Sequence, residues 1–220
     1  SFKAFRWHCI LRWIGIEYTY IQTYTTYQAS VFIGLMTPGR MGEMFRSVYL
    51  KTDHGTPIST GIASTGADRM FDMFGLLLLA GTSVALNPRY GPGRFTALYF
   101  FGGVLIVFIL LLLFLRVSDR KLRNLRLFGS SFIGALLADF RSQVRMLSFR
   151  RILIQIFNTI MPVTIFSLQC TLLAHSVGFD IDPLTAGGIA AVASLVAVIP
   201  VTIYGLGTRE ASVIALMGML

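Results

Sequence analysis

The chain of 220 residues is 55% hydrophobic, carries charge on only 13% of its residues, and has a formal net charge of +9. A soluble globular domain is roughly 25% charged, so this composition, with a mean hydropathy of +0.70, excludes an ordinary soluble fold and predicts a multi-pass protein of the cell (inner or cytoplasmic) membrane. The basic residues concentrate between Arg116 and Arg151 beside apolar segments, which is the positive-inside pattern of membrane proteins and predicts no nucleic-acid partner.

The N-terminal part alternates basic and apolar segments. Ser1 to Gly15 is basic and predicts a segment on the cytoplasmic side. The run from Tyr18 to Met36 is apolar and aromatic, and basic residues return in residues 37–58. Because both flanks of the apolar run are positive, it predicts a re-entrant hairpin that enters and leaves the membrane on one side.

Two long apolar segments follow. Ser59 to Leu86 predicts an outward membrane helix, whose small residues permit close contact with other helices. The pair Asn87-Pro88 ends this helix. Phe95 to Leu115 contains no charged residue and has the length that a bilayer core requires, so it predicts a return span to the cytoplasm.

The C-terminal part begins with a segment, residues 127–147, that is too charged to span a membrane. Its apolar residues recur with helical spacing along one face: Phe128, Phe132, Leu136, Phe140, Val144 and Leu147. This stripe predicts an interfacial amphipathic helix, lying on the cytoplasmic membrane surface or against the helix bundle. Ile152 to Ala174 then predicts an outward span, and Leu184 to Tyr204 an inward span interrupted by Pro200.

Two motifs that combine glycine with charge interrupt these apolar segments. The first is Pro38-Gly39-Arg40-Met41-Gly42-Glu43 with Arg46, and the second is Gly205-Leu206-Gly207-Thr208-Arg209-Glu210. Charge at membrane depth costs a few kcal/mol, and irregular backbone is tolerated there only where protein or water surrounds it. Motifs of this kind at corresponding places in two halves predict an inverted repeat around a midplane site. The predicted fold is therefore an all-α polytopic membrane protein with re-entrant or broken helices and an inverted repeat.

The candidate site residues are the charged groups of these motifs and of the helix between them. Glu43 and Arg46 are three residues apart and share a helical face, as do Asp68 and Asp72 at a spacing of four. One interpretation is that these groups neutralise one another inside the bundle. The other is that the arginines bind a lipid phosphate, because a guanidinium binds phosphate oxygens in a bidentate manner.

On the second interpretation the candidate substrate-binding residues are Arg40, Glu43, Arg46, Asp68, Arg69, Asp72, Arg209 and Glu210. The candidate backbone and hinge residues are Pro38, Gly39, Gly42, Pro200, Gly205 and Gly207. Glycine permits unusual backbone conformations, and exposed N–H groups there can add donors for an anion.

Three stretches, in this order along the chain, carry a family resemblance. The first stretch is the motif that begins at Pro38. The second is Asp68-Arg69-Met70-Phe71-Asp72, and the third is Ile199-Pro200 followed by the motif that begins at Gly205. Together they resemble the lysylphosphatidylglycerol synthase transmembrane-region family. That family includes the flippase part of the bacterial multiple peptide resistance factor, stand-alone flippases, and archaeal proteins linked to dolichol-phosphate sugar metabolism. The resemblance implies a helical protein that handles lipids with charged or glycosylated head groups. It also implies that residues 1–220 form a single transmembrane domain within a larger one.

The predicted function is a lipid flippase, which moves a phospholipid or a polyprenyl-phosphate-linked lipid between leaflets. The expected partners are membrane lipids: an anionic or aminoacylated phospholipid, or a polyprenyl-phosphate lipid. The alternative is a membrane-embedded transferase acting on a lipid phosphate, in which Glu43, Asp68 and Asp72 would hold Mg²⁺; an accessory subunit is a third reading. We expect no cofactor, no bound metal and no catalytic residue. The sequence leaves open a homo-oligomer and a partner lipid-modifying enzyme.

Overall fold

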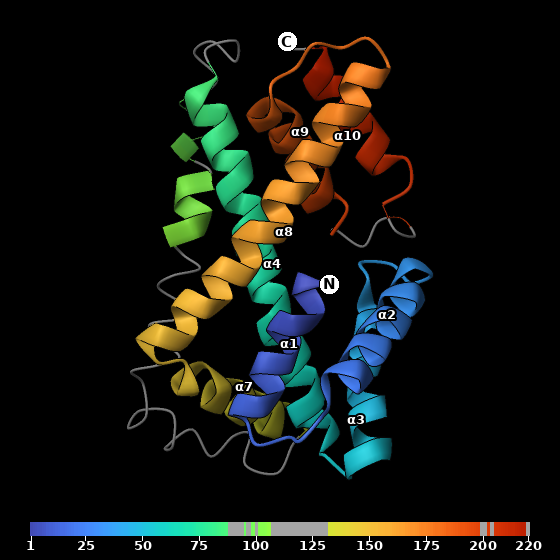
Figure 1. Ribbon diagram of the computed structural model, residues 1–220, viewed down its shortest axis with the longest axis vertical. Helices are drawn as coiled ribbons and strands as arrows, with labels where there is room; N and C mark the ends of the chain where they lie inside the picture. The colour runs from blue at the N-terminus through green and yellow to red at the C-terminus, as the bar shows by residue number, and fades with distance from the viewer. Residues whose placement is uncertain are drawn as a thin grey trace.

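The computed structural model describes residues 1–87, 95, 98, 99, 101–106, 132–198, 202 and 205–218. The regular elements in these residues are helical (Figure 1). They are α1 (Phe2–Trp13), α2 (Tyr20–Leu35), η1 (Met41–Phe45), α3 (Arg46–His54), α4 (Ile58–Leu86), α7 (Phe132–Met146), α8 (Phe149–Ser176), α9 (Pro183–Val196) and α10 (Thr208–Met217). The predicted all-α membrane fold is confirmed.

Four of the predictions fall partly or wholly outside the described residues. They are most of the span Phe95–Leu115, the end of the span Leu184–Tyr204, the prolines Pro88 and Pro200, and residues 127–131 of the amphipathic segment. The end of the first long helix is described and agrees with the prediction, because α4 stops at Leu86 and Asn87 is extended.

Among the described residues, α4 and α8 are the two helices long and apolar enough to cross a membrane. At about 1.5 Å per residue each is roughly 40 Å long, which exceeds a hydrocarbon core of about 30 Å. Both run upward in Figure 1 and cross near the middle of the molecule. Gly75 of α4 permits this crossing, because a Cβ there would lie 2.8 Å from the Thr159 methyl group of α8.

The helix α9 is too short to span and packs between α4 and α8. A Cβ on Gly187 would overlap the side chain of Ser167 in α8, and one on Gly188 would overlap Ser83 in α4. Asp182 caps its first turn by accepting a hydrogen bond of 3.0 Å from the Thr185 N–H. The side-chain hydrogen bond from Thr185 holds the pKa of the Asp182 carboxyl below its usual value.

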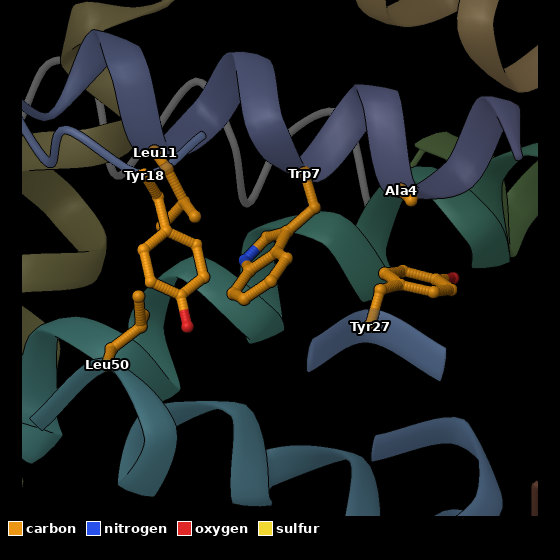
Figure 2. Packing of buried hydrophobic residues seen from close by; sticks show 6 residues of the cluster. All are labelled: Ala4, Trp7, Leu11, Tyr18, Tyr27 and Leu50. Atoms are coloured by element: carbon orange, nitrogen blue, oxygen red, sulfur yellow. The ribbon is translucent and has the colours of Figure 1, made fainter. Parts of the chain in front are cut away.

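The N-terminal segment is more deeply buried than its prediction as a basic segment implies, and its placement on the cytoplasmic side stays a prediction. It forms α1, which packs inside the bundle against α2, α4 and α8. Figure 2 shows buried side chains of α1 packed against side chains from the start of the α2 segment, from α2 and from α3. This cluster consists of Ala4, Trp7, Leu11, Tyr18, Tyr27 and Leu50. Two basic residues of α1, Lys3 and Arg6, contact acids on α4, and the third, Arg12, is exposed.

Two helical hairpins point toward each other at mid-height in Figure 1. In the lower one, α2 rises, the chain turns before η1, and α3 descends; in the upper one, α9 descends and α10 returns upward. The first hairpin contains the motif at Pro38, and the second contains the motif at Gly205. Hairpins of opposite direction are compatible with the predicted re-entrant segments and inverted repeat, which stay predictions.

The helix α7 lies across the lower end of the bundle and is bonded to the start of α4. Asp139 accepts hydrogen bonds from Ser59 at 2.7 Å and from Thr60 at 2.9 Å. Val144 is buried, and Phe140 faces Gly66, where a Cβ would lie 3.7 Å from its ring. These members of the predicted stripe therefore face the bundle, one of the two placements that the sequence left open.

Candidate functional site

Two acids of α4 lie at the centre of the site. Asp68 is about 15 Å along α4 from its start, at 1.5 Å per residue, and Asp72 follows one turn later on the same face. Arg6 of α1 binds both: its Nε donates to Asp68 Oδ1 at 2.7 Å and its Nη2 to Asp72 Oδ1 at 2.7 Å. Its remaining nitrogen, Nη1, donates to Thr159 Oγ1 at 3.2 Å. All three nitrogens of the buried Arg6 guanidinium thus donate hydrogen bonds.

A second buried arginine joins the first motif to the same acid. Arg46 Nη1 donates to Asp68 Oδ2 at 3.0 Å and its Nη2 to Glu43 Oε2 at 2.8 Å. The guanidinium carbon lies 4.1 Å from the centroid of the Tyr27 ring, a distance at which a cation is attracted to the ring face. The predicted contact of Glu43 with Arg46 is present in the structure.

Arg69 completes the set of charges. It contacts Glu43, and its Nη1 lies 3.8 Å from Asp72 Oδ2. We call these six residues the inner network: Arg6, Glu43, Arg46, Asp68, Arg69 and Asp72. Three arginines face three carboxylates, so the network is neutral, which is the condition under which buried charges are tolerated.

The glycines of the first motif let the chain return close to α2. A Cβ on Gly42 would lie 2.6 Å from the Ile33 carbonyl oxygen, and one on Gly34 would lie 2.7 Å from Glu43 Cγ. Gly39 and Arg40 both have positive φ, 59° and 58°. Arg40 is the only described residue other than glycine with this left-handed conformation, which disfavours residues with a Cβ. The tight turn after Pro38 therefore places Glu43 inside the bundle.

A cavity of about 480 Å³ lies beside the inner network. Lys3, Arg40, Asp72 and Arg209 line both this cavity and a narrower recess of about 70 Å³. Arg69 lines the recess as well. The apolar part of the wider cavity's wall comes mainly from α8, with one residue from α4. It includes Leu76, Pro162, Val163, Ile165 and Phe166. Arg40 and Arg209, which come from the two opposed hairpins, thus meet at one cavity.

The two charged residues of the second motif lie in different surroundings. Gly205 and Gly207 both have positive φ, 75° and 85°, and lead into α10. Arg209 faces the cavity. Glu210 instead accepts a hydrogen bond of 2.7 Å from the Gly207 N–H and is exposed, so this contact is local to the start of α10.

Two cations of the site were missed by reasoning from the sequence. Arg6 belongs to the inner network, and Lys3 Nζ lies 3.3 Å from Asp72 Oδ1 at the cavity edge. Lys3 and Arg6 are three residues apart, a spacing that puts both on one helical face. That shared face was the signal available in the sequence, although it does not identify the acids that the two cations contact.

The acids of the site bind arginines and do not converge on an empty centre. In the described part of the chain, no group of three or more His, Cys, Asp or Glu residues is placed to hold a metal ion. The donor chemistry that faces the cavity is instead dominated by guanidinium and ammonium groups, which bind anions.

Comparisons with known proteins agree with this architecture. The family described as the lysylphosphatidylglycerol synthase TM region matches residues 2–220. The chain is 24% identical over 188 residues to UPF0104 membrane protein MJ1078 of Methanocaldococcus jannaschii, which covers 85% of this chain and 79% of that protein. No solved structure matches. Since the family match extends over nearly every residue, the chain belongs to the lysylphosphatidylglycerol synthase transmembrane-region family.

Proposed function

We propose that this protein is a lipid transporter that moves a lipid with a phosphate-containing head group between the two leaflets of a membrane. The observation that carries the proposal is the shared cavity: Arg40 and Arg209 come from opposed hairpins and line the same space. Transport requires that a head group at this point be reached from each side of the bundle in turn. We place the protein in the cell (inner or cytoplasmic) membrane as a multi-pass chain, with membrane lipids as its partners.

The cavity has the two surfaces that an amphiphile requires. Its cationic side suits phosphate oxygens, because a guanidinium offers paired donors to them. Its apolar wall, with Leu76 of α4 and Val163 of α8, suits an acyl or prenyl chain. The position about halfway along α4 supports a site near the middle of the bilayer, where transporters with inverted repeats bind their substrates.

The transferase alternative predicts a different use of the same acids. A metal-dependent transferase needs carboxylates that are available to a cation. Glu43, Asp68 and Asp72 are instead bonded to arginines. The two readings are separated by measuring lipid movement in the absence of any chemical conversion.

The test is reconstitution of the purified protein in liposomes that carry a head-group-labelled phospholipid in both leaflets. An impermeant reagent destroys the label on the outer leaflet, and transport exposes the inner pool. We expect Arg209→Ala to abolish this exposure, and Arg209→Lys to restore part of it because ammonium lacks the bidentate geometry. Arg150→Ala, which changes an exposed arginine at the start of α8, is the matched control. Wild-type liposomes that behave like protein-free liposomes would overturn the proposal.

A further inference from the structure

We propose that the preferred head group carries about two negative charges, as in a phosphate monoester or a diphosphate, and is neither zwitterionic nor aminoacylated. The inference rests on the proposed function, because it names the substrate class of that cavity. It follows from how charge is divided between the inner network and the cavity.

The inner network as a whole adds no net charge for the ligand to balance. Arg6 and Arg46 are both 0% exposed, and each guanidinium is held by acids on more than one side. Its three arginines and three carboxylates cancel. The network therefore fixes the shape of the site and leaves its net charge to the residues that line the cavity.

The residues that line the cavity carry an excess of positive charge. Lys3, Arg40 and Arg209 line it. Lys3 lies 3.3 Å from Asp72 and Arg40 lies 3.9 Å from Glu43, yet the side chains of Lys3 and Arg40 are still 40% and 36% exposed. Among the described residues of this lining, the one acid is Asp72, which already contacts Lys3, Arg6 and Arg69. Six cations and three acids in the network and lining together give +6 − 3 = +3. Counting Glu210, which bonds locally, lowers this to +2.

This excess selects among lipids by charge. Arginine stays protonated in proteins, so the empty cavity keeps at least its two arginine charges. A phosphate monoester carries about −1.5 to −2 at pH 7 and comes nearest to cancelling the excess. A phosphodiester such as phosphatidylglycerol carries a single negative charge, phosphatidylcholine is neutral, and an aminoacylated phosphatidylglycerol adds a further ammonium group to an already cationic space.

The recess has a size that suits a compact anion. A buried water requires at least about 10–15 Å³, so a recess of about 70 Å³ is larger than a single water needs and has room for a compact polar group. Arg40, Arg69 and Arg209 all line it. The wider cavity beside it offers the apolar wall for the chain that carries the phosphate.

Two measurements test the inference with four lipids of identical acyl chains: phosphatidic acid, phosphatidylglycerol, phosphatidylcholine and lysyl-phosphatidylglycerol. The first is the rate of movement in liposomes, and the second is the upward shift in melting temperature of the detergent-purified protein. We expect phosphatidic acid to stabilise the protein at a concentration at least tenfold lower than the other three lipids, and to move fastest. Lys3→Glu and Arg40→Glu should reduce this preference at least tenfold, whereas Arg150→Glu should leave it unchanged.

The outcomes separate this inference from the proposed function. Equal movement of all four lipids, or fastest movement of lysyl-phosphatidylglycerol, overturns the charge inference and leaves the transporter standing. Preferential stabilisation by phosphatidic acid without movement of any lipid supports the charge inference and overturns transport. Equal stabilisation by all four lipids overturns the charge inference whatever the transport assay gives.

Discussion

The substitution Asp68→Asn tests whether the inner network holds the fold together. Asp68 is 0% exposed and accepts from Arg6 at 2.7 Å and from Arg46 at 3.0 Å, one arginine on each carboxylate oxygen. The amide has nearly the same shape but turns one acceptor oxygen into a donor. One of the two arginines then faces an N–H group, and the network changes from neutral to +1.

The expected loss of stability follows from the burial of these groups. Removing one partner of a buried ion pair costs about 3–5 kcal/mol, since it leaves an uncompensated charge. For a chain of this size 1 kcal/mol corresponds to roughly 2–4 °C in Tm, so Asp68→Asn should lower Tm by about 6–20 °C. Thermal unfolding of the detergent-purified protein measures the change. Asp180→Asn, at a fully exposed loop position, is the control and should leave Tm unchanged.

A double-mutant cycle distinguishes charge pairing from a general loss of packing. Arg6→Met removes the cation and leaves an unbranched apolar side chain in its place. With both substitutions present, Arg46 keeps Glu43, and Asp72 keeps Lys3 and its Arg69 contact. The combined loss should therefore be smaller than the sum of the two single losses by at least about 1 kcal/mol. Strictly additive losses, or an Asp68→Asn protein as stable as Asp180→Asn, would refute the reasoning.

Further predictions concern packing and topology. Gly188→Ala should lower Tm because the added Cβ overlaps Ser83, at a cost of about 1–3 kcal/mol. The control Gly102→Ala, with nothing within 4 Å of its Cβ, should leave Tm equal or higher. Equal losses of Tm at both positions would contradict the close contact of α9 with α4. In a cysteine-free background, Asp180→Cys should react with an impermeant thiol reagent in intact cells and Asp53→Cys should not. Asp53 belongs to α3, which descends to the lower end of the molecule in Figure 1, and Asp180 follows α8, which rises to the upper end. Reaction of both from outside would exclude the inverted arrangement.

The helices that could be located from the sequence are those whose own residues determine them. The prediction of Tyr18–Met36 corresponds to α2 at Tyr20–Leu35, and Ser59–Leu86 corresponds to α4 at Ile58–Leu86. A continuous apolar run with a breaking residue at its end is local information. The pairs Glu43 with Arg46 and Asp68 with Asp72 were accessible for the same reason, because helical spacing fixes which residues share a face.

What the sequence did not provide depends on contacts between distant segments. Arg6 lies in a segment that charge counting assigned to the cytoplasm, since the positive-inside rule treats a basic residue as solvated. Its partners, Asp68 and Asp72, are 62 and 66 residues away, and no local pattern specifies such a pairing. Glu210 shows the converse: its place in the second motif suggested the site, whereas its hydrogen bond is to the Gly207 N–H, three residues before it.

The two interpretations that the sequence left open, mutual neutralisation and a phosphate pocket, apply to different residues of the folded chain. Asp68 and Arg46 are sealed from the cavity, and their charges cancel within the bundle. Arg40 and Arg209 line the cavity, where an anion can reach them. Arg69 belongs to both groups, because it contacts Glu43 and also lines the recess. A ligand phosphate that attracts Arg69 competes with Glu43 for it, so binding in the cavity acts directly on the contact that ties the first hairpin to α4.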